Sequence, residues 1–368
     1  MENWVLEVTN IKKEIIKMDY SGFTKRGLQN AEFFLEKIVE GKRGETIVFI
    51  ANEFTYPETT LMSLCAKQLG MKPFIVDLSI YGINWFMPED FEFIPALKSA
   101  IEAADICVTT CMTYAKLLGS SKNMDAILTG EKRCYAYWSH FMQEWEFDQN
   151  EVLMGRKRCV PLRDLLKKSK ILHLTTPKGT DLTCEVGIEN MNAIYEVLAI
   201  APFFAEVAII PKYGTVNGIA VIDGASSKGL INNEFGKREL NLEPIRMTIK
   251  DSVVTDMTGN PLHMERINKY IHDFDPIADH IDEVGIVTCT ATINDDYQWR
   301  IWNDGSHHSN SFHIALGNNV SERSDVVHAK AHCDFDMWNP VMELDGHIIY
   351  KDGKFDDDYI FKASGYSL

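Results

Sequence analysis

The sequence lacks the short motifs that mark the commonest nucleotide, serine-nucleophile and thiol sites. It contains no G-x-G-x-x-G and no G-x-x-x-x-G-K-[ST], so we do not expect its N-terminal half to bind a dinucleotide or ATP through such a loop. It also contains no G-x-S-x-G elbow, which argues against a Ser-His-Asp hydrolase. None of its eight cysteines forms a C-x-x-C pair. The chemistry is therefore sought among His, Asp and Glu.

Basic residues and long apolar runs are also scarce. The 37 Lys and Arg residues against 53 Asp and Glu residues leave a net charge of −16, which argues against a nucleic-acid partner or an anionic membrane. No apolar run approaches the roughly 18 residues of a membrane span, and the N-terminus has neither the basic nor the apolar segment of a signal peptide. Together with the scattered cysteines, this predicts a cytoplasmic protein that contacts neither nucleic acid nor membrane.

The length of 368 residues predicts two domains, because single hydrophobic cores stop growing at about 250–300 residues. In the first half, helical and β-rich segments alternate, which predicts βαβ units and a mostly parallel sheet. The second half is β-rich with few helices. We therefore expect an α/β fold, with a three-layer α/β scaffold domain over 1–165 and a β-rich α+β metal-binding domain over 166–368.

Individual elements are predicted from apolar periodicity and turn residues. Helices are expected at 24–40, 58–69, 94–104 and within 264–274. Strands are expected at 45–50, 73–78, 106–110, 134–138, 171–176, 181–186, 204–211, 215–222, 247–254 and 283–290. A closing hairpin is expected around Asp352-Gly353.

A His and a carboxylate stand two residues apart near the C-terminus, in His332-Cys333-Asp334. In an extended strand side chains repeat with a period of two, so His332 and Asp334 would point the same way and could bind one ion. Cys333 would point to the opposite face, as a small buried hydrophobe. An H-x-D pair alone is a weak signal, because it often arises by chance.

Three further candidates stand in strand-like apolar runs: Glu206, Glu283 and His313. A buried carboxylate costs several kcal/mol unless a cation or a hydrogen-bond donor compensates it. A lone His in an apolar run is more often a core residue than a ligand. The glutamates could instead lie on exposed edge strands or pair with arginines. The arginines available for such pairing are Arg246, Arg266 and Arg300.

A shared metal site explains the five candidates better than a separate explanation for each one. Two ions about 3.5–4 Å apart need bridging carboxylates, and His and carboxylate ligands to cap them. Without the two glutamates, the remaining two His and one Asp are the facial triad of non-haem Fe(II) oxygenases. The residue pattern does not choose between these sites. The nearby pair His307-His308 is interpreted as part of a loop.

The order of these motifs resembles the thermophilic-type leucyl aminopeptidases, the aminopeptidase T family. Five stretches match in order: 177–183, Ala205-Glu206-Val207 with Pro211, 282–286, 312–317 and His332-Cys333-Asp334. The similarity covers roughly residues 170–350, and the N-terminal half only by general architecture. A second branch with the same fold, the 2,5-dihydroxypyridine 5,6-dioxygenases, is similar in its H-x-D ending but binds one Fe(II).

The resemblance implies a homodimer with an α/β N-terminal domain and a site for two divalent ions of zinc, cobalt or manganese, or for one Fe(II) in the second branch. Carried over by position, the ligands would be Glu206, Glu283, His313, His332 and Asp334. The chain departs from the aminopeptidase pattern at one position. That family has a Tyr about seven residues after the histidine of the fourth stretch, where this chain has Val320.

We therefore expect a metal-dependent hydrolase of aminopeptidase type that acts on a peptide or small-molecule substrate. A metal-bound hydroxide would attack the amide, and Glu206 or Glu283 would move the proton. The first alternative is a ring-cleaving Fe(II) dioxygenase that uses His313, His332 and Asp334. The second alternative is a non-catalytic dimeric binding protein, in which the glutamates pair with arginines.

Overall fold

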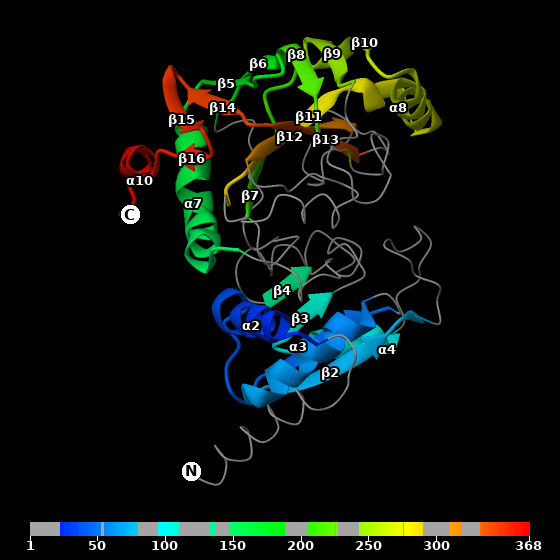
Figure 1. The fold of residues 1–368 in the computed structure, drawn as a ribbon, viewed down its shortest axis with the longest axis vertical. Coiled ribbons are helices and arrows are strands. Elements are labelled where there is room, and N and C mark those ends of the chain that lie inside the picture. Colours follow the sequence, from blue (N-terminus) through cyan, green and yellow to red (C-terminus); the bar gives the residue numbers. More distant parts are fainter. Residues whose placement is uncertain are drawn as a thin grey trace. The chain divides into compact units, whose positions relative to one another are not determined.

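The chain forms two compact units, each described here by itself. The computed structural model describes residues 23–52, 55–79, 95–109, 133–136, 147–187, 205–224, 226, 243–274, 276–289, 310–317 and 332–368 (Figure 1). The first unit comprises 1–146 and 197–202, and the second comprises 147–196 and 203–368. A parallel sheet in the first unit and antiparallel sheets in the second confirm the predicted mixed α/β class.

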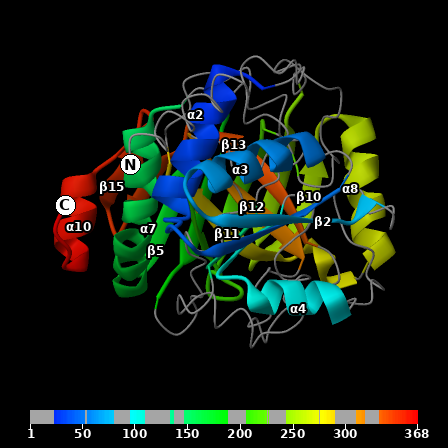
Figure 2. The same cartoon turned by 90° about the horizontal axis from the view of Figure 1, so that it is seen from below.

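The first unit is built on a four-stranded parallel sheet in the order β2-β1-β3-β4. Its strands are β1 (Thr46–Ala51), β2 (Lys72–Asp77), β3 (Ile106–Thr109) and β4 (Arg133–Ala136). Its helices are α2 (Lys25–Phe33), the π-helix η1 (Phe34–Ile38), α3 (Tyr56–Gln68) and α4 (Pro95–Ala103). Helices α3 and α4 lie on opposite sides of the sheet (Figure 2), as right-handed crossovers require for this strand order.

The second unit contains two antiparallel sheets. The larger has eight strands in the order β10-β9-β8-β6-β5-β14-β15-β16, and the smaller has the order β13-β12-β11-β7. The larger sheet consists of β5 (Ile171–Thr175), β6 (Asp181–Glu185), β8 (Asn217–Ile222), β9 (Ile245–Lys250), β10 (Val253–Thr258), β14 (Val341–Leu344), β15 (His347–Lys351) and β16 (Lys354–Phe355). The smaller consists of β7 (Glu206–Ile209), β11 (Ile281–Val287), β12 (Ser311–Gly317) and β13 (His332–Trp338). The helices are α7 (Gln149–Lys168), α8 (Pro261–Phe274), the 3-10 helix η6 (Pro276–Asp279) and α10 (Asp357–Ser364).

One hydrophobic core joins the two sheets of the second unit. Leu172 and Met247 enter it from the larger sheet, Ile286 and Phe335 from the smaller, and Leu162 from α7, all fully buried. The larger sheet alternates buried and accessible positions along β5, as expected for a sheet with one solvated face. The smaller sheet is buried along nearly its whole length, so polar groups on its strands need partners.

Helix α7 is the largest element that the sequence analysis missed. Asp148 caps it by accepting from the backbone N–H groups of Asn150 and Glu151, but Gly155 and Pro161 interrupt its helical pattern. The second unit consequently begins at residue 147 rather than at 166, because α7 packs on the smaller sheet. A Cβ at Gly155 would lie 2.7 Å from the Cα of Cys289, which shows how closely the helix approaches the end of β11.

The single strand expected at 247–254 is in fact two strands. Residues Asp251 and Ser252 have φ of 52° and 68° and turn the chain from β9 into β10. Ser252 also accepts a hydrogen bond from the Val216 backbone N–H through its Oγ, at 3.2 Å. The strand pattern runs through the turn because both strands carry β-branched residues, and no Gly or Pro marks the break.

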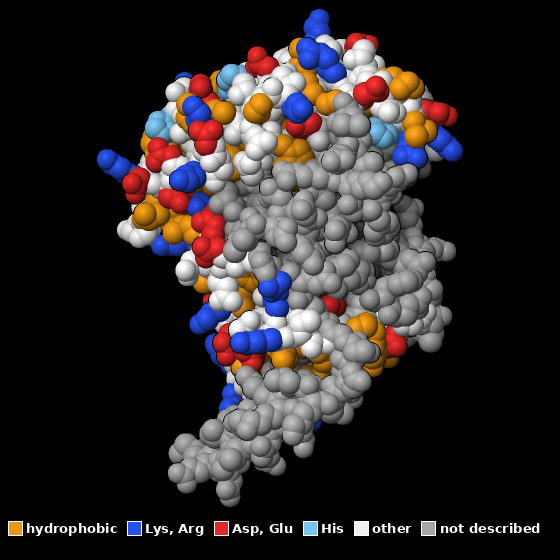
Figure 3. Space-filling model, viewed as in Figure 1, with side chains coloured by type: hydrophobic (Ala, Val, Ile, Leu, Met, Phe, Trp, Pro, Cys, Tyr) orange, Lys and Arg blue, Asp and Glu red, His pale blue; other side chains and the backbone are white. Residues whose placement is uncertain are grey.

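The described helices include none that is long and apolar enough to cross a membrane. Lys and Arg side chains are interspersed with Asp and Glu side chains on the face of the molecule seen in Figure 3.

Candidate metal centre

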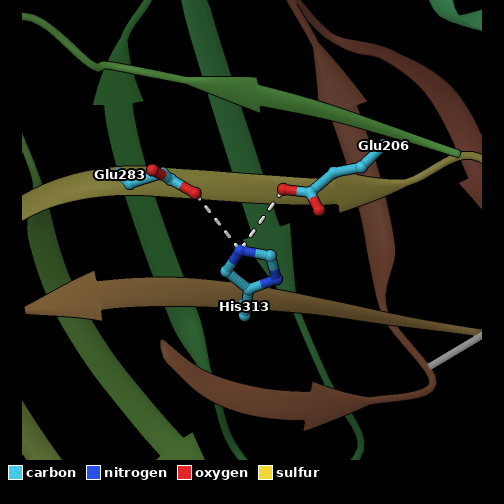
Figure 4. A group of neighbouring side chains, drawn as sticks. All are labelled: Glu206, Glu283 and His313. Carbon is cyan, nitrogen blue, oxygen red and sulfur yellow. Dashed lines mark hydrogen bonds and ion pairs between the residues drawn. The ribbon is translucent and has the colours of Figure 1, made fainter. Parts of the chain in front are cut away.

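All five predicted ligands lie on the smaller sheet of the second unit, and every one of its strands contributes. Glu206 opens β7, Glu283 lies on β11, His313 on β12, and His332 and Asp334 on β13. Figure 4 shows the imidazole of His313 pointing toward the carboxylates of Glu206 and Glu283. The structure thus brings together residues that are up to 128 positions apart in sequence, which the motifs alone could only suggest.

The donor atoms lie at distances suited to shared cations. Nε2 of His313 is 3.4 Å from Oε1 of Glu206 and 3.4 Å from Oε1 of Glu283. Oδ1 of Asp334 lies 3.0 Å from Nε2 of His332 and 4.0 Å from Nε2 of His313. The donors fall into two groups of three, Glu206–Glu283–His313 and Glu283–His332–Asp334, each with its ligand atoms within 4.8 Å of one another. Glu283 belongs to both groups.

Strand periodicity and register explain the arrangement. His332 and Asp334 are two apart on β13, so they share a face, as the sequence predicted. Asp334 pairs in register with Ala315, two residues beyond His313 on β12. On β11 the register shifts between Ile281 and Glu283, which is the mark of a β-bulge. Bulges next to functional sites re-aim side chains, and this one directly precedes Glu283.

Burial makes the cluster of negative charge costly without a cation. His313 is 1% exposed, Glu283 3% and Asp334 8%. Burial by itself would lower the pKa of His313, but the nearby carboxylates of Glu206, Glu283 and Asp334 outweigh it and hold that pKa well above its ordinary value. The potential at Nε2 of His313 is therefore strongly negative. The same negative potential that otherwise keeps a proton on His313 would attract a divalent cation.

The surroundings of Glu283 fit a bound metal ion better than an ion pair with an arginine or exposure on an edge strand. Oε2 of Glu283 is buried and accepts no hydrogen bond from any residue that the structure describes. Within the described ranges Glu283 has no arginine ion pair, and its charged partner is His313. Arg246 is exposed on β9, while Arg300 lies outside the described residues. The buried, unsatisfied oxygen is the observation that a bound cation would explain.

Two residues at the site were not predicted. Gly285 lies opposite His313 in the register of β11 and β12, and a glycine inside a strand pattern is a recognised sign of close approach. Tyr270 on α8 donates from its hydroxyl to the backbone oxygen of His332 at 3.1 Å, and burial raises its pKa, so the hydroxyl remains a donor. No sequence signal indicated Tyr270, because the contact spans 62 residues. Val320 and the pair His307-His308 lie outside the described residues.

Comparisons with known proteins agree with this fold. A solved structure of 2,5-dihydroxypyridine dioxygenase from Pseudomonas putida KT2440 matches with a TM-score of 0.62 and 16% identity, over 90% of this chain and 97% of that one. Wild-type AmpT from Thermus thermophilus matches with a TM-score of 0.54 and 12% identity, over 91% of this chain and 100% of that one. At such identities the likeness shows the fold alone. No curated protein sequence matches the chain.

The fold and the clustered donors are those of a metal-dependent enzyme. The model of the NicX family, 2,5-dihydroxypyridine 5,6-dioxygenase, matches residues 31–357, which is most of the chain. The chain belongs to this family. The expected aminopeptidase activity is therefore less well supported than its dioxygenase alternative.

Proposed function

We propose that the protein is a non-haem Fe(II) dioxygenase that opens a dihydroxylated pyridine ring. The family match over 31–357 carries this proposal. The donor set supports it, because two histidines and one aspartate are the ligands that mononuclear Fe(II) oxygenases use. A cytoplasmic location and a homodimer stay predictions.

In this proposal His313, His332 and Asp334 would hold the iron. Asp334 lies between the two histidines, at 3.0 and 4.0 Å from their Nε2 atoms. Fe(II), when bound, supplies the electrons that make O2 reactive beside the ring. The reaction adds both atoms of one O2 to the substrate and breaks one ring bond, so no external reductant is required.

The two glutamates have a separate role in this proposal. Oε2 of Glu283 is buried without a hydrogen bond to the described residues, so it can accept a proton from a ring hydroxyl placed against it. Glu206, whose Oε1 atom is 3.4 Å from Nε2 of His313, adds negative charge beside the position where that imidazole would hold the iron. The deep burial of His313 and Glu283 keeps bulk water away from the reacting ring.

The test is oxygen uptake by protein purified without oxygen and loaded with Fe(II). With 2,5-dihydroxypyridine we expect uptake of one O2 per ring opened, and both atoms of ¹⁸O2 in the product. Asp334→Ala should abolish uptake, whereas His347→Ala, at a partly exposed histidine of β15 that pairs with Asp356, should leave it unchanged. Absence of uptake with every dihydroxypyridine tried would overturn the proposal.

A second candidate is the two-ion hydrolase. The observation in its favour is the pair of three-donor groups that share Glu283, since a shared carboxylate is what bridges two ions. Three carboxylates also carry more negative charge than one divalent ion offsets. Hydrolysis of amino-acid amides by protein loaded with zinc, cobalt or manganese, without oxygen uptake, would support this candidate instead.

A further inference from the structure

We propose that Gly285 is a positioning residue of the metal centre. Its missing side chain lets the imidazole of His313 lie over strand β11 and reach the carboxylate of Glu206. Any side chain at position 285 would then break the Glu206–Glu283–His313 group and spare the Glu283–His332–Asp334 group. The inference rests on the metal centre of the proposed function, but not on the reaction that it performs.

The register of the smaller sheet places Gly285 in the path of the imidazole. Gly285 pairs with His313 on β12 and with Ala208 on β7, so it lies between these strands. Side chains paired in register share a face of the sheet. His313 must therefore pass over Gly285 to bring its Nε2 within 3.4 Å of Glu206, which lies on the far strand.

The space above Gly285 is already filled by the ligands. A Cβ built on Gly285 would overlap Cε1 and Nε2 of His313 and would lie 2.6 Å from Oε1 of Glu206. Distances under about 3 Å do not occur for real Cβ atoms, so one group must move. His313 is 1% exposed and has little room to shift without losing a carboxylate.

The backbone gives no other reason for a glycine here. Gly285 does not have the positive φ of Gly317 at the end of β12, which is 95°. In the middle of a strand a glycine costs about 0.5–1 kcal/mol relative to alanine. Close approach of the imidazole is thus the feature that accounts for Gly285.

The test uses two variants of neighbouring residues on β11 that each add one carbon on opposite faces. Gly285→Ala adds it on the ligand face, and Val284→Ile adds it on the core face, where Val284 is 1% exposed. Binding of Co²⁺ to metal-free protein, followed by its visible absorption and by competition with a chelator, measures the site without turnover. Far-UV circular dichroism and the Tm of the metal-free proteins report folding.

We expect Gly285→Ala to weaken Co²⁺ binding by roughly 10–100-fold and to change the Co²⁺ spectrum, because a ligand is displaced. Val284→Ile should lower the Tm but bind Co²⁺ as the wild type does. In a Glu206→Gln background the effect of Gly285→Ala should shrink, since the contact that it breaks is already weakened. Wild-type Co²⁺ affinity in Gly285→Ala, or full additivity with Glu206→Gln, would overturn the inference. Weakened Co²⁺ binding without any ring cleavage by the wild type would sink the proposed function and leave this inference standing.

Discussion

At the scale of single residues, Glu283 holds the most informative position. It belongs to both three-donor groups, and its Oε2 atom is buried without a hydrogen bond to the described residues. Gly285 lies two positions later on the same strand, beneath the imidazole of His313. A metal ligand, a proton acceptor and a bridge between two ions are all roles that a carboxylate in this place can perform.

Glu283→Gln keeps the size of the side chain and removes its charge. We expect activity to fall roughly 10–100-fold or more, because both proton acceptance and charge balance at the metal depend on the carboxylate. Circular dichroism should show an intact fold. Glu343→Gln on β14, away from the site, is the matched control. Full activity in Glu283→Gln would remove this residue from the site.

Asp223 gives the stability of the protein a pH dependence. Burial raises the pKa of this carboxyl from 3.8 to about 6, although it accepts a hydrogen bond from the backbone N–H of Trp338 at 2.9 Å. Between these two values the folded state holds a proton that the unfolded chain has released. The stability that the protonated Asp223 carboxyl gives to the folded state is thus fully present below about pH 4 and is lost as the pH rises to about 6.

Asp223→Asn retains an oxygen that can accept from Trp338 but cannot titrate. We expect the fall in Tm between pH 4 and 6 that Asp223 causes to disappear in this variant. Thermal unfolding at several pH values measures it. An identical pH profile in wild type and variant would show that Asp223 ionises normally.

The candidate site was largely predictable at this scale, for a physical reason. The period-two rule for strands placed His332 and Asp334 on one face, and the cost of burying carboxylates singled out Glu206 and Glu283. Gly285 and Tyr270 could not be found in the same way. Their roles depend on which strand or helix lies beside them, and register is not readable from local sequence.

At the scale of elements, α7 and α10 are joined by a partly buried ion pair. Nε of Arg158 on α7 donates to Oδ1 of Asp357 at 2.5 Å, and Nη2 donates to Oδ2 at 2.8 Å. Arg158 also pairs with Glu151 at 3.2 Å and donates to the backbone oxygen of Thr288. The guanidinium thereby connects α10, α7 and the segment directly after β11.

Removal of Asp357 would leave a buried guanidinium short of one carboxylate. The Arg158 side chain is 3% exposed, so we expect Asp357→Ala to lower the free energy of unfolding by about 3 kcal/mol. The adjacent, exposed Asp358 provides a control, since Asp358→Ala should change it by less than about 0.5 kcal/mol. Chemical denaturation monitored by fluorescence would measure both. Equal stability of the two variants would contradict a structural role for this pair.

Elements were predicted best where the local pattern was unbroken. The hairpin of β5 and β6, around Pro177 to Thr180, follows its alternating pattern and turn residues. Helix α7 was missed because Gly155 and Pro161 interrupt its helical pattern, and its stability comes from packing on α10 and β7. The domain boundary at 165 followed from that omission.

At the scale of the whole molecule, the second unit carries the donors and encloses them between buried strands. The family match extends from residue 31 to 357, so it also includes the first unit. The sequence predicted the α/β class and the sheet types, because strand and helix periodicities differ. Its first choice was the aminopeptidase branch, whereas the family match supports the dioxygenase alternative better, because the residue pattern did not choose between a two-ion site and a one-iron site.

Metal content tests the central claim most directly. The protein would be purified without chelators, once in air and once without oxygen, and each sample analysed for transition metals. We predict about one iron per chain in the oxygen-free sample and a lower iron content in the aerobic one, as expected for one 2-His-1-carboxylate site. About two equivalents of zinc, cobalt or manganese, with no iron in either sample, would contradict the dioxygenase and support the two-ion hydrolase.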